Sequence, residues 1–115
     1  MSYQWLIPDM FWPTGADTPA YVSHESICVL NTSDEDATIN ITLFFENEAP
    51  AILQPAHCGA KRAAHIRMDK IKTAAGAHIQ RGVPYAACVE SNVNLAVQYS
   101  RLDTNANCTL MTTIL

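Results

Sequence analysis

The chain has 115 residues, of which 49% are hydrophobic and 16% are charged, and its formal net charge is −4. This length suits one domain with a core of its own, so we expect residues 1–115 to form a single domain. The negative charge and the lack of a lysine or arginine run argue against nucleic acid as the main partner. Lys61, Arg62 and Arg67 lie close together in the sequence, however, so a local basic patch that binds nucleic acid is an open alternative.

The N-terminus has no charged segment followed by an apolar one, and no apolar run reaches the ~20 residues that span a bilayer. We therefore expect a cytoplasmic protein. Few charged residues cover its surface, which favours an oligomer over the alternative of a monomer with ordinary apolar patches. We expect the four cysteines to be buried thiols, since they form no C-x-x-C pair: Cys28, Cys58, Cys88 and Cys108.

The first predicted strand covers residues 3–7 and ends at Pro8, because proline interrupts a strand's hydrogen bonds. Residues 9–20 mix prolines and a glycine with aromatic residues, which predicts an ordered loop. Within this loop, Trp12 beside Phe11 has two interpretations. It either packs onto the core or offers a stacking surface to a sugar or another flat ligand.

The next predicted strand opens at Tyr21, and residues 23–47 predict two strands joined by an acidic turn over residues 31–36. We expect a plain hairpin here. The run 27–30 is apolar on both faces, which is typical of a strand covered on both sides. Residues 38–46 alternate, with Ile39, Ile41 and Leu43 on one face. Phe44 lies among polar residues on the other face, so we expect it to pack against a neighbouring subunit.

Seven further segments complete the pattern. Residues 51–53 lie between prolines and predict an edge strand, residues 57–59 a turn, and residues 61–68 a strand with alternating burial. Residues 69–82 predict a short helix or a loop. Residues 85–90, 95–103 and 108–115 predict the last three strands. Seven or eight short strands with little helix indicate an all-β fold, an antiparallel β-sandwich similar to a jelly roll.

Polar side chains that could form a site lie on three of these strands: Ser23, His24 and Glu25; Arg62, His65 and Arg67; Gln98, Arg101 and Asp103. Histidine and carboxylate are metal ligands, but adjacent strand residues such as His24 and Glu25 point to opposite faces. We therefore prefer ion pairs and loop contacts to a metal site, and we expect no cofactor. If Arg101 faces inward it needs an acidic partner, for which Glu25, Glu90 and Asp103 are candidates.

No catalytic pattern is present. The consecutive Ser23, His24 and Glu25 cannot adopt the geometry of a triad, and the G-x-S-x-G, H-E-x-x-H and P-loop patterns are missing. A cysteine nucleophile would need a base nearby, whereas Cys28 and Cys88 lie in apolar runs. We therefore predict a protein that is not an enzyme.

Four segments together resemble the sensory rhodopsin transducer family: W-x-I-P from Trp5, SHESICVLNTSDEDA from Ser23, R-x-x-H-I-R from Arg62 and SNVNLAVQYSRLD from Ser91. They follow one another in order along nearly the whole chain. The resemblance implies a cytoplasmic, jelly-roll-like homotetramer that binds the cytoplasmic face of a membrane photoreceptor and relays its signal. A carbohydrate or another small ligand is the alternative that it implies, and DNA binding is a third.

We accordingly predict an oligomeric binding and signalling module. Its candidate ligand-binding or partner-binding residues are Trp12, His24, Glu25, Arg62, His65, Arg67, Arg101 and Asp103. Phe44 is the candidate for a contact between subunits.

Overall fold

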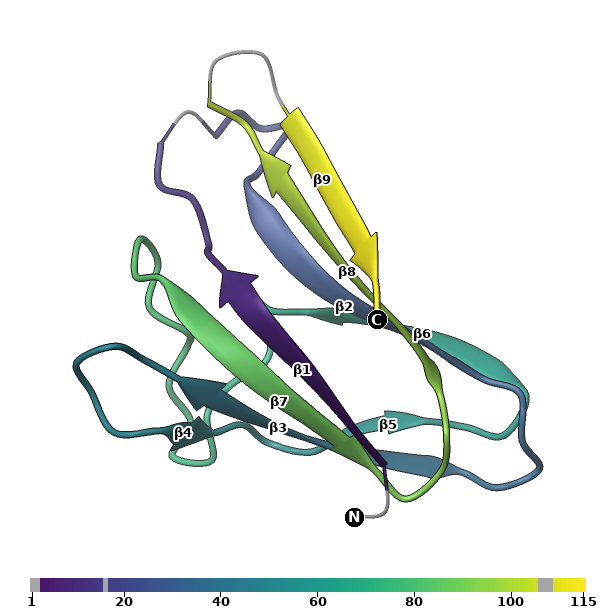
Figure 1. The fold of residues 1–115 in the computed structure, drawn as a ribbon. Helices are drawn as coiled ribbons and strands as arrows, with labels where there is room; N and C mark the ends of the chain where they lie inside the picture. The colour runs from purple at the N-terminus through teal and green to yellow at the C-terminus, as the bar shows by residue number, and fades with distance from the viewer. Residues whose placement is uncertain (1–2, 16, 106–108) are drawn as a thin grey trace.

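The computed structural model describes residues 3–15, 17–105 and 109–115. Nine strands form in this part of the chain (Figure 1): β1 (Tyr3–Met10), β2 (His24–Asn31), β3 (Ala37–Phe44), β4 (Ala51–Ile52), β5 (Ala56–Cys58), β6 (Arg62–Arg67), β7 (Tyr85–Ser91), β8 (Ala96–Asp103) and β9 (Thr109–Ile114). The predicted number was seven or eight. Counting all nine includes β4 and β5, which have only two and three residues.

The strands form two antiparallel sheets that face each other as a sandwich (Figure 1). Sheet A has the order β1-β7-β3-β4, with β5 also paired to β3, and sheet B has the order β6-β2-β8-β9. The described residues contain no helix, so the predicted all-β sandwich is confirmed. In particular, residues 69–82 form a loop tied down by two isolated bridges rather than a helical turn.

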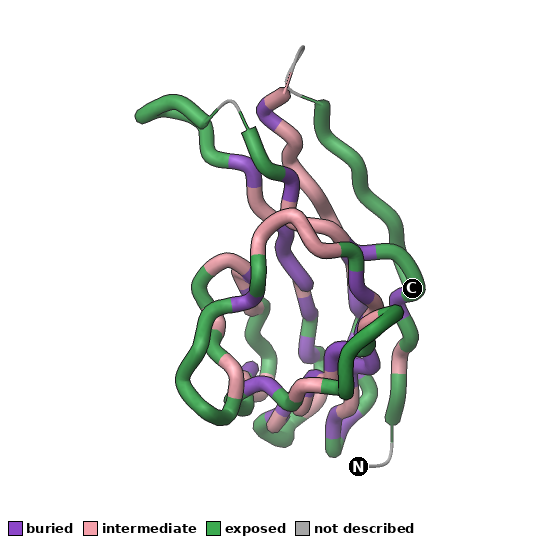
Figure 2. Tube along the Cα trace, turned by 90° about the vertical axis from the view of Figure 1, so that its left-hand side faces the viewer, coloured by how far each residue is buried: buried purple, intermediate pink, exposed green. Residues whose placement is uncertain are grey.

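The core lies between the sheets and follows the alternation of the sequence. Ile39, Ile41 and Leu43 on β3 are at most 1% exposed, and they belong to the same buried cluster as Val97 and Tyr99 of sheet B. Burial of these apolar side chains is the main stabilising contribution to such a fold. Figure 2 shows that β9, by contrast, is exposed along its whole length.

The acidic turn does not make the predicted hairpin. β2 pairs with β6 and β8 in sheet B, whereas β3 pairs with β4, β5 and β7 in sheet A, so the turn carries the chain from one sheet to the other. Asn31 holds it there. Its fully buried amide group donates to the carbonyl oxygens of Glu35, Cys58 and Gly59 at 2.7–3.2 Å. These contacts satisfy backbone groups that a hairpin ladder would otherwise pair.

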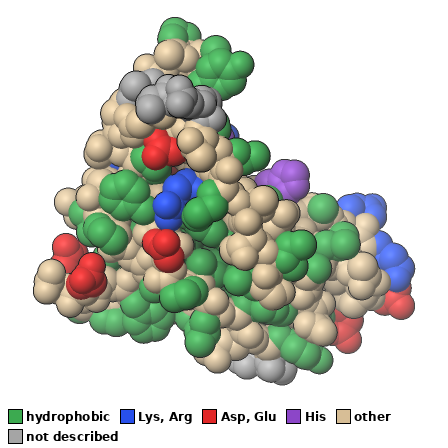
Figure 3. Space-filling model, turned by 45° about the horizontal axis from the view of Figure 1, so that its top comes forward, with side chains coloured by type: hydrophobic (Ala, Val, Ile, Leu, Met, Phe, Trp, Pro, Cys, Tyr) green, Lys and Arg blue, Asp and Glu red, His purple; other side chains and the backbone are tan. Residues whose placement is uncertain are grey.

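We had expected β2 to be covered on both faces, but only one of its faces is covered. Ile27 and Val29 are buried in the core, but Leu30 is 48% exposed and Cys28 is half-buried on the outer face of sheet B. Apolar side chains form much of the molecular surface in Figure 3 as well. The second apolar face of β2 is therefore an exposed face of sheet B, and no further layer of the described chain covers it.

Three predicted element boundaries were wrong. β1 continues through Pro8 to Met10, with a register shift between Ile7 and Met10. Proline is tolerated there because β1 is an edge strand and the shift removes the need for its missing N–H. β2 begins at His24 rather than Tyr21, and His57 lies in β5 rather than in a turn.

No described helix is long and apolar enough to cross a membrane. Cys28, Cys58 and Cys88 are free thiols, and the latter two are buried as predicted. Cys108 lies outside the described residues.

Candidate functional site

The carboxylate of Glu25 lies in the interior, at the end of the sandwich where β1, β2 and β8 meet the start of β7. Glu25 is 1% exposed. Its Oε1 accepts a hydrogen bond of 2.6 Å from the hydroxyl of Tyr85. Its Oε2 accepts from the hydroxyl of Tyr99 and, at 2.7 Å, from the backbone N–H of Phe11. A buried carboxylate needs such donors, so Glu25 joins four strands or strand ends from both sheets.

The two tyrosines are fixed in their neutral form by this arrangement. Burial raises the pKa of the Tyr85 hydroxyl far above its ordinary value, and the negative charge of Glu25 raises it further. Burial and the hydrogen bond to Glu25 raise the pKa of Tyr99 in the same way. Both hydroxyls therefore stay protonated and donate to Glu25 across the physiological range.

Arg101 closes the cluster toward solvent. Its Nε donates to the hydroxyl of Tyr99 at 3.0 Å and lies 4.0 Å from Oε2 of Glu25. Its guanidinium carbon is 6.0 Å from the ring centre of Phe11, which is within the range of a cation–π contact. Its Nη2 is buried and makes no hydrogen bond to any described residue.

The acidic partners of Arg101 are only partly those predicted. Glu25 is one of them, as proposed. The second is Asp9 on β1, with Oδ1 3.6 Å from Nη2, and no sequence pattern indicated this partner. Asp103 instead accepts two hydrogen bonds of 2.9 Å from Asn105, so it shapes the turn after β8.

Trp12 is anchored in the loop before β2. Its indole Nε1 donates to the carbonyl oxygen of Ser23 at 2.7 Å, and the guanidinium of Arg81 lies 5.0 Å from the ring centre. Arg81 pairs with Asp17 at 2.8 Å. Hydrogen bonds from Arg81 and from the Ser23 backbone hold the pKa of the Asp17 carboxyl well below its usual range. Arg81 thus occupies a position against the indole that a stacking ligand would need.

His24 and Arg67 lie at the same end of sheet B as Glu25. His24 Nδ1 is 2.8 Å from the carbonyl oxygen of Val22. Arg67 binds Asp69 through two hydrogen bonds of 2.8 Å. Burial by itself would raise the pKa of the Asp69 carboxyl, but the hydrogen bonds and charge of Arg67 have a larger effect, so the net pKa is lowered. The ion pair is the structural interpretation that we preferred for Arg67.

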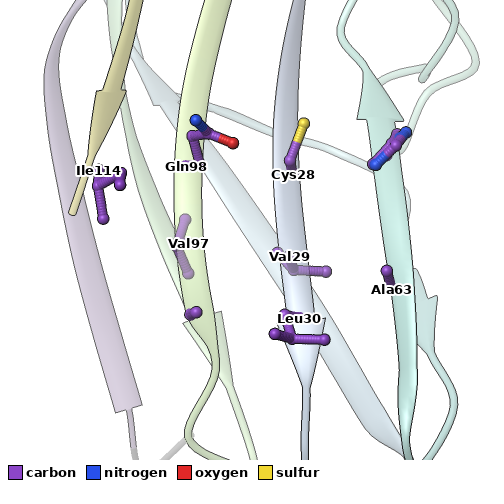
Figure 4. Close-up of a pocket in the computed structure, with 9 residues that line it drawn as sticks. Cys28, Val29, Leu30, Ala63, Val97, Gln98 and Ile114 are labelled. Carbon is purple, nitrogen blue, oxygen red and sulfur yellow. The ribbon is translucent and has the colours of Figure 1, made fainter.

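The other two candidates lie elsewhere on sheet B. Arg62 is exposed opposite Asn31 at the far end of β6. His65 lies opposite Cys28 in the middle of the sheet, beside a shallow, mainly apolar groove of about 350 Å³ on its outer face. Figure 4 shows the groove crossing β8 and β2, with Gln98, Cys28 and Leu30 along it and Ile114 of β9 at one side.

The predicted basic patch is not continuous. Lys61 pairs with Asp34 at 3.2 Å, and Arg67 pairs with Asp69. In the described residues, no three His, Cys, Asp or Glu side chains lie where they could hold a metal ion. What the site offers is therefore hydrogen bonding, charge and apolar contact.

Comparison with known proteins agrees with this picture. The family model described as Anabaena sensory rhodopsin transducer matches residues 2–115. The chain belongs to this family. Among solved structures of similar fold, the Anabaena sensory rhodopsin transducer is 31% identical, with a TM-score of 0.76 and coverage of 88% of each chain.

A second solved structure similar to this chain is the crystal structure of Thermotoga maritima 1070. It is 40% identical, with a TM-score of 0.85, and the match covers 96% of this chain and 90% of that one. No functionally curated protein matches the chain. The resemblance found in the four sequence segments is thus confirmed over nearly the full length of this member of the transducer family.

Proposed function

We propose that this protein is a non-enzymatic, oligomeric signalling module that works in the cytoplasm. It binds the cytoplasmic face of a membrane photoreceptor, a sensory rhodopsin, and relays its signal by protein–protein contact. Membership of the transducer family supports the photoreceptor as partner. The observation that supports a function in protein–protein contact is the uncovered apolar outer face of sheet B.

The outer face of sheet B is uncovered because no other layer of the described chain packs on it. Leu110 and Ile114 on β9 are 68% and 77% exposed on this face, and Leu30 on β2 is 48% exposed. Edge strands and apolar patches of this kind are normally covered in soluble proteins, since they otherwise promote uncontrolled association. We infer that a second copy of the chain covers this face. A tetramer built from two different contacts needs another surface, for which Phe44, 44% exposed on sheet A, is our candidate.

Retention by photoreceptor membranes tests the proposal. Purified protein is incubated with membrane vesicles that contain the source organism's sensory rhodopsin, and with matched vesicles that lack it. We expect retention only by the first. Equal retention by both vesicle types, or by neither, would exclude the photoreceptor as partner.

A small-ligand function is a second candidate, and it is favoured by Nη2 of Arg101, which is buried and makes no hydrogen bond to a described residue. A buried guanidinium nitrogen without a hydrogen bond is costly, and an anionic or hydroxyl-rich ligand would relieve that cost. A thermal-shift screen of carboxylates and sugars tests this. A ligand that raises the melting temperature of the wild type but not of Arg101→Lys would support it, and no shift with any compound would argue against it.

A further inference from the structure

Sheet A has a hollow of about 410 Å³ where the end of β1, the end of β3 and the start of β7 come together. Pro8, Phe45, Pro84 and Tyr85 are among its lining residues. Phe44, our candidate for the second subunit contact, lines it as well, so the hollow borders that proposed contact. The rings of Phe45 and Tyr85 lie 6.3 Å apart at 44°. Because the Tyr85 hydroxyl is bound to Glu25, its ring adds apolar surface to the hollow. The volume is within the range of ligand sites.

Carboxylates from two separate elements line the same hollow. Asp9 comes from β1, and Glu46 comes from the loop between β3 and β4. Glu46 and Glu48 also line a smaller adjoining hollow of about 90 Å³. Both glutamates are exposed, and no described residue forms an ion pair or hydrogen bond with either carboxylate. Asp9 is 81% exposed, with Arg101 as its one ion-pair partner in the described chain.

An aromatic and proline lining with the exposed, unpaired carboxylates of Glu46 and Glu48 beside it complements a cation that also has apolar surface. Arginine fits best, since its flat guanidinium can stack on rings while it donates to carboxylates. On the face shown in Figure 3, acidic side chains lie next to apolar ones, and one of them also adjoins a basic side chain. The cytoplasmic loops of membrane proteins carry an excess of lysine and arginine, so such a partner would present this chemistry.

We propose that this hollow is the docking site for an arginine side chain in a basic cytoplasmic segment of the membrane partner. The inference rests on the proposed function for the identity of that partner. The hollow and its charges, however, can be tested without the partner.

The probe is a blocked synthetic peptide with arginines spaced by leucine and glycine, and its control has glutamine in place of each arginine. Binding to the full chain is measured by isothermal titration at low and at high salt. We expect the arginine peptide to bind at low salt and to weaken as salt rises, while the glutamine peptide does not bind. In the double variant Glu46→Gln/Glu48→Gln, the dissociation constant should rise about fivefold, the effect of two exposed charge pairs.

The matched control variant is Glu35→Gln. Glu35 is also exposed, but it lies in the turn before β3, whereas Glu46 follows the other end of that strand. Eight strand residues separate the two by about 25 Å. Glu35→Gln should bind the peptide as the wild type does. Equal weakening in both variants, or no binding of the arginine peptide, would overturn the inference.

A second copy of the chain is another occupant that the test separates. If Glu46→Gln/Glu48→Gln changes the mass of the protein in solution, the hollow is an interface between copies and the inference is wrong. If the peptide binds as expected but photoreceptor vesicles do not retain the protein, the hollow takes arginine and the proposed photoreceptor partner fails instead.

Discussion

The hydroxyl of Tyr85, on β7 in sheet A, donates a hydrogen bond of 2.6 Å to the buried carboxylate of Glu25, on β2 in sheet B. This bond crosses the core and joins the two sheets at one end of the sandwich. Tyr99 and Phe11 complete the carboxylate's set of donors. The apolar layers elsewhere can slide with little directional preference, but this contact has a defined geometry.

We expect Tyr85→Phe to destabilise the fold. The substitution keeps the ring and removes one donor, so a buried charged acceptor is left short of a partner, at a cost of about 1–3 kcal/mol in the free energy of unfolding. Urea denaturation measures the effect. The control is Tyr21→Phe, because Tyr21 is 59% exposed and its hydroxyl makes no hydrogen bond to a described residue. Its change should stay within about 0.5 kcal/mol. Equal effects of the two variants would contradict a structural role for the Glu25 cluster.

Acid should weaken the attachment of the loop that contains Trp12. The pKa of Asp17 is lowered in the folded state from an ordinary value of 3.8, chiefly by its hydrogen bond from Arg81. A lowered folded-state pKa adds stability that is fully present above the unfolded value and is lost as the pH falls through the folded value. At pH values under about 4, the melting temperature of the wild type should therefore decrease more steeply with falling pH than that of Asp17→Asn. Parallel pH profiles would show that Asp17 contributes nothing to this dependence.

A charge on the outer face of sheet B should break one subunit contact. Leu30→Asp and Ile114→Asp place a carboxylate in the proposed apolar interface, where desolvating it without a partner is unfavourable. We expect the mass measured by light scattering after size exclusion to halve. Ile52→Asp on β4 is the control, since Ile52 is 62% exposed but lies on the other sheet. A full-size oligomer in both sheet B variants would place the contact elsewhere.

Phe44→Asp tests the second proposed contact. Phe44 ends β3 and stays 44% exposed in the single chain, as the sequence pattern predicted for a subunit contact. We expect this variant also to halve the mass in solution, and to yield monomers when combined with Leu30→Asp. An intact oligomer in Phe44→Asp would show that the prediction for this residue was wrong.

The amino-acid sequence by itself determined most of the strands and the inward face of β3. The alternation of Ile39, Ile41 and Leu43 places them on one face whatever the strand pairs with, because side chains alternate along any strand. The same local rule correctly separated the buried Glu25 from its neighbour His24. The four family segments then identified the relatives, because they preserve a whole pattern rather than one residue.

Only the tertiary structure decided which strands share a sheet and which groups meet. Nothing local shows that β2 and β3 belong to opposite sheets, since the acidic turn that joins them would also suit a hairpin. The partners of Glu25 lie 60 and 74 residues away in Tyr85 and Tyr99, and Asp9 reaches Arg101 only because β1 forms the edge of the facing sheet. Pairing between distant strands determines such contacts, and the alternation of side chains along one strand does not predict that pairing.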